Sequence, residues 1–519
     1  MWRKRHKERN GGLIVKVTLG PAGPDADVSP GITLLEAWPG RAGLDPVCGG
    51  KGRCGGCRVR ILGGDVSGAD EDEVEVLARL GSRPEHRLAC RVRVLGDVRA
   101  LADPPGGAGR TPDHRGPVPV STPAAPSVAA AGRLGLAVDL GTTKLAGYLA
   151  DLDTGTLLET DAIPNPQRRF GADVISRLGY ALTSPRHYRQ VREAVALGVT
   201  ELADRLCRKA GRSRGAIREM TVAGNPAMHH LLLGLDVTTL ARAPFQPATV
   251  EPITVPAREI GLPIPALVYF LPCVAGFVGG DHVAALLATG AGTLRGGALI
   301  VDIGTNAEIT LARDGTLTTC SCASGPAFEG AQISRGVRAV AGAVDKVWLE
   351  GGRVRFRVIG GGAPAGICGA GLLDLVAALL ATGTIDRSGR LRAGAEGVGL
   401  LLTQADIREL QLAKAAVRVG IEALLRETGT AVEEIERVYL AGSFGTYLDP
   451  EKAVAIGLFP PLSPDRFVAV GNAAGQGALA TLTSPEKRAE AAWLARKVRH
   501  LDLTSRPGYQ EHFLGALGF

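Results

Sequence analysis

Two stretches of the chain carry the same order of apolar and polar positions. In each, a run of apolar, β-favouring residues (134–138 and 298–301) leads into an Asp, then into a Gly with hydroxyl or amide neighbours, and then into a second apolar run. This pattern predicts a β-hairpin with a polar turn. The two stretches are Val138-Asp139-Leu140-Gly141-Thr142-Thr143 and Val301-Asp302-Ile303-Gly304-Thr305-Asn306.

The repeat extends beyond the turns. Asp153-Thr154-Gly155-Thr156-Leu157 follows the first copy at nearly the offset at which Arg313-Asp314-Gly315-Thr316-Leu317 follows the second. A repeated unit of strand, turn and strand is best explained by two similar lobes that face each other across a cleft. Strand-like and helix-like stretches alternate from residue 133 to residue 519, as in an α/β fold. The helical candidates are 188–209, 281–288, 372–380, 403–426 and 485–498.

The chain before this region has a different pattern. Residues 12–101 indicate a small mixed α+β domain, and residues 102–132, rich in Pro, Gly and Ala, break all periodicity and indicate a linker. In the small domain, strands are predicted at 13–19, 58–62, 88–95 and 98–101, and helices at 32–38 and 71–80. The full division is a basic tail at 1–11, the small domain at 12–101, the linker at 102–132, and a two-lobed domain at 133–519 with lobes at 133–297 and 298–480 and a C-terminal helical segment at 481–519.

The turns of the two hairpins are suited to bind phosphate. Their glycines allow a tight turn that brings backbone N–H groups close to an anion, and the hydroxyl side chains add donors. The residues concerned are Gly141, Thr142, Thr143, Gly304, Thr305 and Asn306. Asp139 and Asp302, at the strand ends, would suit a hydrated Mg²⁺ that bridges phosphate oxygens.

Four of the nine cysteines lie in the small domain. Three share a glycine-rich loop with C-x5-C-x2-C spacing, and the fourth follows later in Leu88-Ala89-Cys90-Arg91; the set is Cys48, Cys54, Cys57 and Cys90. Disulfides, structural zinc and an iron–sulfur cluster are the alternatives. Disulfides are disfavoured in a cytosolic protein, and zinc sites usually pair two C-x2-C knuckles where this sequence has one. Three loop cysteines with one remote cysteine are typical of 2Fe-2S ferredoxins, whose plant-type spacing is C-x4-C-x2-C.

Composition narrows the classes of function. The formal net charge is +7, yet Lys and Arg are scattered beyond the first few residues and aromatics make up 4%, which argues against nucleic-acid binding. No apolar segment long enough for a signal peptide follows the basic first residues. The longest apolar run, 267–278, is broken by Pro272 and is too short to span a bilayer. The sequence therefore predicts a cytoplasmic protein with no membrane or nucleic-acid partner.

The cysteine spacing and the hairpin repeat each resemble a known family. The x5 spacing resembles that of adrenodoxin-like proteins, which implies a β-grasp 2Fe-2S ferredoxin domain with all four cysteines as ligands. The hairpins resemble the phosphate 1 and phosphate 2 loops of the actin, sugar kinase and Hsp70 ATPases, which have a two-lobed, ribonuclease H-like fold. Val438-Tyr439-Leu440-Ala441-Gly442-Ser443-Phe444-Gly445 resembles the adenosine loop of that superfamily. ATP would then lie between the lobes, with its adenosine framed by Gly442, Ser443, Gly471 and Asn472.

A ferredoxin of this spacing fused to such an ATPase resembles the reductive activators of corrinoid proteins. The stretches that carry the resemblance are Asn165-Pro166-Gln167, Gly171-Ala172-Asp173-Val174-Ile175-Ser176-Arg177, Gly224-Asn225 with His230, Ser324-Gly325-Pro326-Ala327-Phe328-Glu329-Gly330, and Gly366-Ile367-Cys368-Gly369. The resemblance implies ATP-dependent transfer of an electron from the 2Fe-2S cluster to an inactive Co(II) corrinoid protein of a methyltransferase system, which restores Co(I). It also implies an upstream low-potential reductant.

The same resemblance implies roles for single residues. Asp139 and Asp302 would organise Mg²⁺ and the attacking water, and residues 324–330 would face the corrinoid. Further candidates, for which a helix cap or a solvated position is the alternative, are Lys144, Asp173, Asp281 and Glu329. Larger members of that family carry a small extra domain where this chain has only residues 102–132, so the docking of the ferredoxin domain stays open. A homodimer is an open alternative for the assembly.

The remaining reactive side chains have plainer interpretations. Five further cysteines have apolar or small neighbours and are expected to be buried: Cys207, Cys273, Cys320, Cys322 and Cys368. His229 and His230 are expected to pack in the core. Three alternative functions stay open: an ATP-coupled electron donor to another low-potential acceptor, a small-molecule kinase with a redox sensor, and a redox-controlled nucleotide-binding module.

Overall fold

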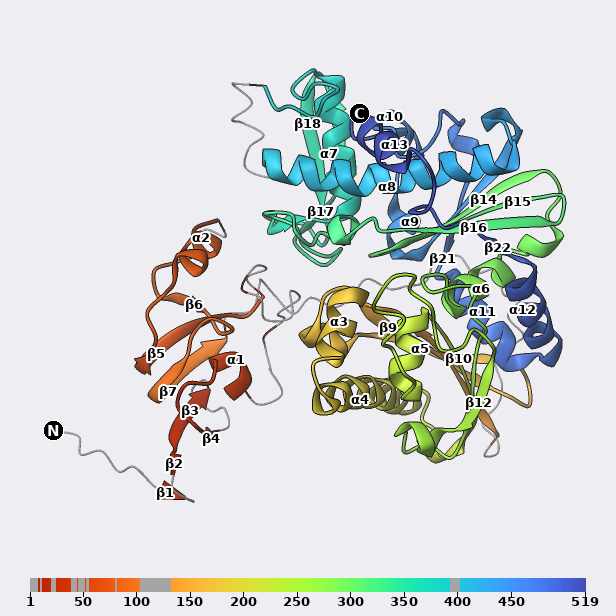
Figure 1. The fold of residues 1–519 in the computed structure, drawn as a ribbon. Coiled ribbons are helices and arrows are strands. Elements are labelled where there is room, and N and C mark those ends of the chain that lie inside the picture. Colours follow the sequence, from red (N-terminus) through yellow and green to blue (C-terminus); the bar gives the residue numbers. More distant parts are fainter. Residues whose placement is uncertain are drawn as a thin grey trace. The chain divides into compact units, whose positions relative to one another are not determined.

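The structure is a computed structural model of the chain, and it describes residues 8–9, 12–19, 25–38, 44, 52, 56–79, 82–102, 132–392 and 402–519. The chain divides into a small N-terminal unit and a large unit, each with its own hydrophobic core (Figure 1). Nearly all of the predicted tail and linker lies outside the described residues, as do Cys48 and Cys54.

The small unit is built on a five-stranded mixed sheet of order β4-β3-β7-β5-β6. The first and last long strands, β3 and β7, are parallel neighbours at its centre, which is the β-grasp arrangement that was predicted. A capping box at Thr33 starts the short helix α1. The elements are β1 (Glu8–Arg9), β2 (Gly12–Leu13), β3 (Val15–Leu19), β4 (Asp25–Val28), α1 (Leu34–Ala37), β5 (Arg58–Val66), α2 (Glu71–Arg79), β6 (His86–Leu88) and β7 (Val94–Ala102).

One predicted strand of the small unit is wrong. The apolar alternation at 88–95 does not form a single strand, because the chain turns after β6 and re-enters the sheet only at β7. The backbone N–H groups of Arg91 and Val92 both donate to the Leu88 carbonyl, at 2.7 and 3.0 Å, and this closes the turn. Cys90 therefore lies in a turn and not in a strand.

The first half of the large unit is a six-stranded sheet of order β10-β9-β8-β11-β13-β12. Strand β8 is antiparallel to β9 and parallel to β11. Its residues form an almost continuous apolar run because helices cover both faces of the sheet. The elements are β8 (Leu134–Leu140), β9 (Lys144–Asp151), β10 (Leu157–Pro164), α3 (Val174–Ala181), α4 (Pro185–Lys209), β11 (Ile217–Gly224), α5 (Pro226–Leu233), β12 (Ile253–Pro256), β13 (Leu267–Phe270) and α6 (Gly280–Ala288).

The second half repeats this topology in a sheet of order β21-β20-β14-β15-β16-β22, with a three-stranded sheet β18-β17-β19 inserted after β16. Strand β14 is antiparallel to β15 and parallel to β20. The elements are β14 (Gly297–Ile303), β15 (Ala307–Arg313), β16 (Thr316–Cys322), β17 (Ala343–Glu350), β18 (Arg353–Val358), β19 (Gly366–Ile367), α7 (Gly369–Ala381), α8 (Gln404–Thr428), β20 (Ile435–Ala441), α9 (Gly442–Tyr447), α10 (Pro450–Ala455), β21 (Phe467–Gly471), α11 (Ala473–Thr483), α12 (Pro485–Lys497), β22 (Arg499–His500) and α13 (Tyr509–Gly515). All five predicted helices of the large unit are confirmed, as α4, α6, α7, α8 and α12, with ends shifted by a few residues.

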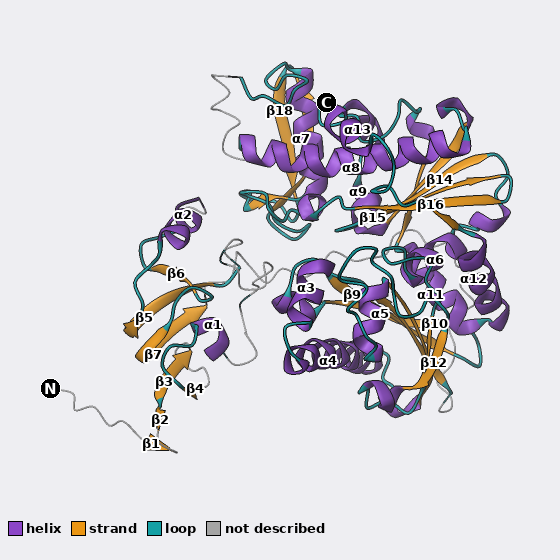
Figure 2. Cartoon of the chain, viewed as in Figure 1, coloured by secondary structure: helices purple, strands orange, loops and turns teal. Residues whose placement is uncertain are grey.

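Helices α6 and α11 pack on each other where the two halves join (Figure 2). Helix α11 follows a strand of the second sheet but packs on β8 and β11 of the first, where Leu482 lies against Gly135. Helix α6 follows a strand of the first sheet but reaches the second, where His282 Nε2 lies 2.6 Å from Thr310 Oγ1. The helices cross closely, because a Cβ on Gly477 would lie 2.0 Å from the Ala284 carbonyl oxygen. These two helices join the two halves around the strand ends that carry the predicted site.

Candidate cluster site and nucleotide site

Two of the four predicted cluster cysteines are described by the structure, and their side chains meet. Cys57 lies in the turn that enters β5, and Cys90 lies in the turn that follows β6. Their Sγ atoms are 3.3 Å apart, well beyond the roughly 2.05 Å of a disulfide. Both residues are nearly buried, with exposed fractions of 1% and 9%. Two thiols from separate elements thus converge on one point, which fits a pair of cluster ligands.

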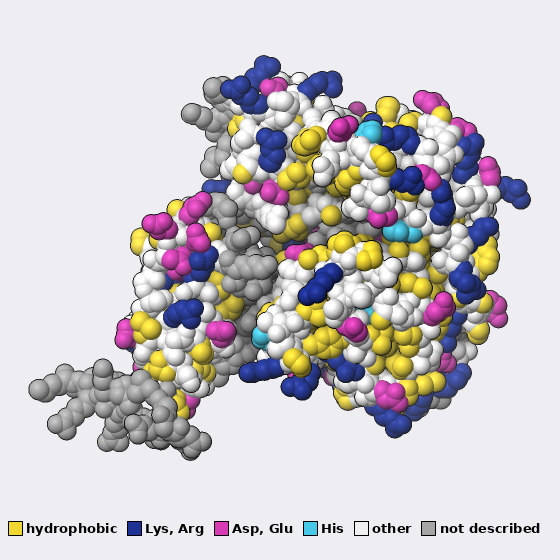
Figure 3. Space-filling view, viewed as in Figure 1, with side chains coloured by type: hydrophobic (Ala, Val, Ile, Leu, Met, Phe, Trp, Pro, Cys, Tyr) yellow, Lys and Arg dark blue, Asp and Glu magenta, His cyan; other side chains and the backbone are white. Residues whose placement is uncertain are grey.

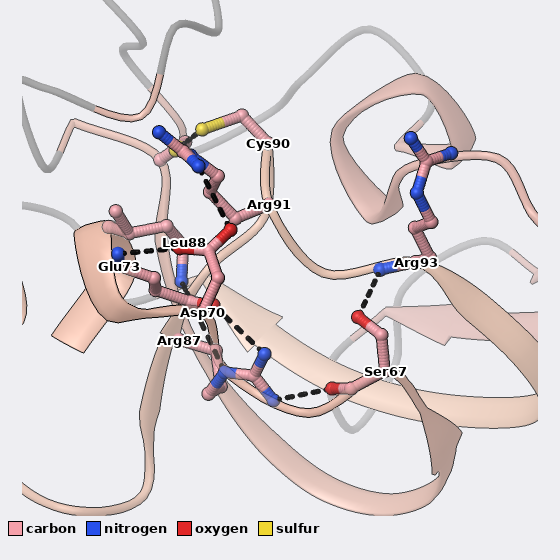
Figure 4. A network of polar contacts seen from close by, with 9 residues as sticks. Ser67, Asp70, Glu73, Arg87, Leu88, Cys90, Arg91 and Arg93 are labelled. Carbon is pink, nitrogen blue, oxygen red and sulfur yellow. Dashed lines mark hydrogen bonds and ion pairs between the residues drawn. The ribbon is translucent and has the colours of Figure 1, made fainter.

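A polar network holds the turn that carries Cys90 (Figure 4). Glu73 of α2 accepts from Nε and Nη2 of Arg87 at 2.9 Å each, and from the backbone N–H of Leu88 at 2.7 Å. The Glu73 side chain is 1% exposed, so water screens this bidentate pair little. Arg91, next to Cys90, pairs with two aspartates near the start of α2 at 2.9 and 2.8 Å. The network therefore fixes the backbone on both sides of the thiol.

In the large unit, the two predicted phosphate turns face each other. Thr143 Oγ1 of the β8–β9 turn lies 3.4 Å from Thr305 Oγ1 of the β14–β15 turn. Asp139 and Asp302 occupy equivalent places, since each is the penultimate residue of its strand, in register with the end of a parallel neighbour. The duplication read from the sequence thus brings both turns and both aspartates to one place.

Donors placed behind the first turn hold its backbone. Asn165 Nδ2 donates to the Gly141 carbonyl at 2.8 Å, and the Asn165 backbone N–H donates to the Thr143 carbonyl at 2.9 Å. Arg177 Nη2, from α3, donates to the Thr142 carbonyl at 2.9 Å. All three carbonyl groups of residues 141–143 are therefore engaged by the protein.

The hydroxyl of Thr142 is oriented by the start of α5. Asn225 is the N-cap of that helix and accepts from the backbone N–H of Met228 at 3.1 Å. Its Nδ2 donates to Thr142 Oγ1 at 2.9 Å. Because Oγ1 accepts this bond, the hydroxyl hydrogen of Thr142 stays available to a ligand oxygen.

The second turn has different partners. Thr305 Oγ1 donates to Glu329 Oε1 at 2.8 Å, and Ser324 Oγ lies 3.3 Å from the Gly304 carbonyl and 3.4 Å from the Thr305 carbonyl. The backbone N–H of Gly304 donates to the Asn306 carbonyl at 2.9 Å and closes the turn. Ser324 and Glu329 thus lie at the second turn, and a contact of residues 324–330 with a corrinoid stays a prediction.

Acidic groups dominate the electrostatics of the site. Desolvation, reinforced by the charge of Asp139, raises the pKa of Asp302 to about 7. Desolvation also raises the pKa of Asp281 to about 7 and that of Glu308 well above its ordinary value, and other site carboxylates add to both shifts. The pKa of Asp139 is raised by desolvation too, but a hydrogen bond from Asn472 and the charge of Lys144 oppose the rise. Carboxylates forced together in this way favour a bound cation.

Two residues of the predicted adenosine region contact these aspartates. Asn472, the N-cap of α11, donates from Nδ2 to Asp139 Oδ2 at 2.8 Å and accepts from the backbone N–H of Gly475 at 2.9 Å. Gly442 has a φ of +82°, and a Cβ there would lie 2.7 Å from Asp302 Oδ1. Only glycine suits both conditions. The predicted adenosine region and the two aspartates Asp139 and Asp302 therefore lie in one connected site.

The other candidates lie at or near this site in different ways. Gly471 ends β21 with a φ of +66° and directly precedes Asn472. The side chain of Ser443 lies outside the described residues. Asp173 caps α3, accepting from the Ser176 backbone N–H at 2.8 Å, so the cap interpretation holds for it. Among the described residues, no group of three or more His, Cys, Asp or Glu side chains could hold a metal ion.

Sequence reasoning assigned no role to Asn165, Arg177 or Asn225, although the motifs it quoted contain all three. Two of them precede a proline at the end of a strand, in Asn165-Pro166 and Asn225-Pro226. That position was a usable signal, because an Asn there can serve both as a cap and as a donor. The five other cysteines are buried as expected, and so are His229 and His230, which are 3% and 1% exposed.

Family models match most of the chain. The 2Fe-2S iron-sulfur cluster binding domain matches residues 17–95, the RACo middle region matches 134–292, and the C-terminal domain of RACo, the ASKHA domain, matches 297–519. The corrinoid activation enzyme RamQ of Eubacterium limosum is 34% identical over 412 residues, which cover 73% of this chain and 69% of that protein. The chain belongs to the family of reductive activators of corrinoid proteins.

Two further members of the activator family are similar along most of their length. The Co(II) methylated amine-specific corrinoid protein reductase of Methanosarcina barkeri is 26% identical over 424 residues, which cover 74% of this chain and 77% of that protein. A solved structure of a reductive activator for a corrinoid, iron-sulfur protein superposes with a TM-score of 0.70 at 29% identity, covering 97% of this chain and 98% of that one.

Membership in the activator family establishes the architecture. The chain joins a 2Fe-2S ferredoxin domain to an ATPase domain of the actin, sugar kinase and Hsp70 type, so its cofactors are a 2Fe-2S cluster and ATP. None of the described helices is long and apolar enough to cross a membrane. Lys and Arg are interspersed with Asp and Glu on the face shown in Figure 3.

Proposed function

We propose that this chain is an ATP-dependent reductive activator that passes one electron to the Co(II) form of a corrinoid protein of a methyltransferase system and so restores Co(I). The observation that carries the proposal is the union in one chain of converging thiols in a ferredoxin domain with two facing phosphate turns and their aspartates. The relatives named as a corrinoid activation enzyme and a corrinoid protein reductase support the choice of acceptor.

We assign the electron site to Cys48, Cys54, Cys57 and Cys90. A 2Fe-2S cluster bound there would store one electron, at a potential near about −400 mV if it behaves like plant-type clusters. The chain supplies four thiolates and nearly buries the two that are described. The network around Glu73 and Arg87 keeps one of these thiols in place. An upstream low-potential reductant would supply the electron.

We assign the nucleotide site to the large unit. Backbone N–H groups and hydroxyls of residues 141–143 and 304–306 would bind the phosphates. Asp139 and Asp302 would hold hydrated Mg²⁺ and orient the attacking water, and the Asn472 amide keeps Asp139 in place. The adenosine would be framed by Gly442, Ser443, Gly471 and Asn472.

ATP is needed because the electron moves uphill. The cobalt of an inactive corrinoid accepts an electron only at a potential below that of such a cluster, and each 100 mV of deficit costs about 2.3 kcal/mol per electron. Two lobes joined by the packed helices α6 and α11 can convert nucleotide binding and hydrolysis into a change of shape. This supplies the deficit only if the acceptor binds the two shapes with different affinity.

The proposal includes the domain division 1–11, 12–101, 102–132 and 133–519, with lobes at 133–297 and 298–480. The division places a Pro-rich tether between the electron carrier and the ATPase, which lets the carrier move toward the acceptor. A cytoplasmic location is part of the same proposal, since both the acceptor and the reductant would be cytoplasmic.

The test is spectroscopy of the anaerobically purified full chain, mixed with a Co(II) corrinoid protein with and without MgATP. We expect the ultraviolet–visible and EPR spectra of a 2Fe-2S cluster, and formation of Co(I) only when MgATP is present. A cluster signal without ATP-dependent Co(I) formation would point to another low-potential acceptor. Zinc, or no cluster, would contradict the electron-transfer proposal.

Matched variants separate the two sites. Cys57→Ser should remove or strongly alter the cluster signal, whereas Cys207→Ser, at a buried cysteine of α4, should leave it unchanged. Asp302→Asn should keep the cluster signal but lose Co(I) formation. Loss of the cluster in both cysteine variants would show that folding, and not ligation, is being measured.

A further inference from the structure

The carbonyl groups of the first phosphate turn are all held by hydrogen bonds from the protein. The carbonyl oxygens of Gly141 and Thr143 accept from the side-chain Nδ2 and the backbone N–H of Asn165, at 2.8 and 2.9 Å. Arg177 engages the carbonyl of Thr142 between them at 2.9 Å. Three successive carbonyls are thus bound by two residues, and the side chains of both also reach the sulfur of Met228, at 3.7 and 3.1 Å.

This arrangement fixes where the N–H groups point. In a planar trans peptide the C=O and N–H bonds are directed oppositely. When the Gly141 and Thr142 carbonyls point toward Asn165 and Arg177, the N–H groups of Thr142 and Thr143 must point away from them. The Thr143 side chain approaches the second turn, with its Oγ1 3.4 Å from Thr305 Oγ1. A pair of N–H groups held in this way forms a concavity that binds anions.

The two donors are well placed to hold the turn rigidly. Arg177 is completely buried and Asn165 is 1% exposed. Arg177 Nη1 also lies 3.1 Å from the sulfur of Met228, which is itself buried in α5. An arginine is seldom buried to this extent unless its donors are used. Its planar guanidinium spans the turn and α5 at once, which the point-like ammonium of a lysine cannot do.

We infer that Arg177 and Asn165 are positioning residues that aim the N–H groups of the first turn at the phosphates of bound nucleotide. The inference rests on the proposed nucleotide site and adds which residues make that site prefer ATP to adenosine. These residues touch neither phosphate nor adenosine, so they act through the backbone of residues 141–143. Their contribution therefore concerns the phosphates of ATP and leaves the adenosine contacts unchanged.

The experiment measures the affinity of the full chain for MgATP, MgADP and adenosine by calorimetry, together with ATP hydrolysis. Arg177→Lys and Asn165→Ala should each lower the ratio of ATP to adenosine affinity by about tenfold or more, because one or more hydrogen bonds to a charged phosphate are misdirected. Asn165→Ala keeps the backbone bond to Thr143 and should fold even if Arg177→Lys is unstable.

Arg192→Lys is the matched control. Arg192 of α4 also donates to two backbone carbonyls, those of Leu232 and Glu259, at 3.3 and 3.1 Å, but these lie outside the phosphate turns. The Arg192→Lys variant should lose some thermal stability and keep the wild-type ratio of ATP to adenosine affinity. The ratio separates positioning from simple destabilisation, because a structural defect lowers all three affinities together.

Two other outcomes would overturn the inference in distinguishable ways. If the wild type binds ATP more tightly than adenosine and both variants keep that ratio, the positioning role is wrong while the nucleotide site stands. If the wild type itself binds ATP no better than adenosine, the proposed phosphate site and the positioning role fall together.

Discussion

The two phosphate turns of the ATPase domain occupy equivalent positions but are supported to different degrees. In the first turn, three carbonyls accept bonds of 2.8 to 2.9 Å from an amide, a guanidinium and a backbone N–H. In the second, the hydroxyl of Ser324 lies at 3.3 and 3.4 Å from two carbonyls. Shorter and charge-assisted bonds are stronger, so the first turn is the better fixed of the two.

The aspartates of the two turns also differ, and the aspartate of the first turn is the better compensated. Asp139 receives a hydrogen bond from Asn472 and the favourable charge of Lys144. Desolvation and the charge of Asp139 act on Asp302, and both raise its pKa. The first half is therefore preorganised for a ligand, whereas the second half gains most from the arrival of a cation. The first half of the duplicated fold is thus held rigidly, whereas the second half can adjust. We therefore expect the change of shape on nucleotide binding to begin in the second half.

The largest expected effect comes from the aspartates themselves. Asp139→Asn and Asp302→Asn should each lower kcat for ATP hydrolysis by about 100-fold or more, because each removes a charge that stabilises the transition state. The comparison predicts a further difference. Asp302→Asn should raise the thermal midpoint of the nucleotide-free protein more than Asp139→Asn, since its charge is less compensated. Phosphate release and thermal unfolding measure the two effects.

Asp153→Asn is the control for these variants. Asp153 pairs with Arg133 near the surface, and its side chain is 49% exposed. Its substitution should change neither hydrolysis nor the midpoint measurably. If Asp302→Asn lowered the thermal midpoint of the nucleotide-free protein, the charge of Asp302 would not be the less compensated of the two, and the comparison of the halves would be wrong.

The glycines that follow the two parallel strands give the next largest effect. Gly442 has a φ of +82°, and a Cβ there would lie 2.7 Å from Asp302 Oδ1. At its counterpart Gly224, which has no positive φ, a Cβ would lie 2.9 Å from the Leu140 carbonyl oxygen. Gly442→Ala should therefore lower hydrolysis more than tenfold, through about 1 kcal/mol of backbone strain and displacement of Asp302. Gly224→Ala should lower the rate of ATP hydrolysis only a few-fold. Equal losses of hydrolysis in the two variants would contradict the comparison of the two halves.

Much of this site could be predicted from local sequence. The hairpins, the aspartates and the repeat depend on apolar alternation and turn residues, which are short-range features. The contact of Asn472 with Asp139 joins residues 333 positions apart, and it exists because α11 crosses from one sheet to the other. Helical periodicity shows that α11 has an apolar face but not which sheet that face covers, so this contact could not be predicted.

The small unit gives a matching example. Residues 88–95 alternate like a strand, yet Leu88 accepts two backbone hydrogen bonds that turn the chain at Cys90. Local alternation could not reveal this turn, because it is fixed by partners elsewhere in the sequence: Glu73 binds Arg87 and Leu88. The role of Cys90 as a cluster ligand stays a prediction, whereas the strand that was expected to carry it is wrong.

Ser324→Ala tests the weaker support of the second turn. Its long hydrogen bonds should contribute little, so we expect KM for ATP to rise and kcat to fall by about two- to fivefold, from a loss of at most about 1 kcal/mol. Ser213→Ala, at the cap of a short surface helix, should have no effect on either constant. A loss for Ser324→Ala as large as that for Asn165→Ala would show that the two turns are equally well held.

The smallest effect concerns pH and again distinguishes the halves. His230 of α5 is neutral in the fold, because its Nδ1 lies 2.7 Å from the Pro226 carbonyl and its Nε2 accepts from the backbone N–H of Ala248 at 3.0 Å. Desolvation lowers its pKa, and lowers that of His229 to about 3. The counterpart helix α9 contains no histidine.

The sign of the pH effect follows from these shifts. Below about pH 6.5 the unfolded chain binds protons at both histidines while the folded chain does not, so each histidine lowers stability as pH decreases, by up to about 1.4 kcal/mol per pH unit. Asp281 and Asp302, whose pKa values are raised to about 7, act in the opposite direction, so the effect of the histidines is read from the difference between variant and wild type. His230→Gln should flatten this slope between pH 6.5 and 5 in urea unfolding. Amide exchange, corrected for its intrinsic rate, should rise in α5 before α9 over the same interval. If amide exchange rose in α5 and α9 at the same pH, acid would open the two halves together. The packed helices α6 and α11 would then couple the halves so strongly that the histidines of α5 do not destabilise one half alone.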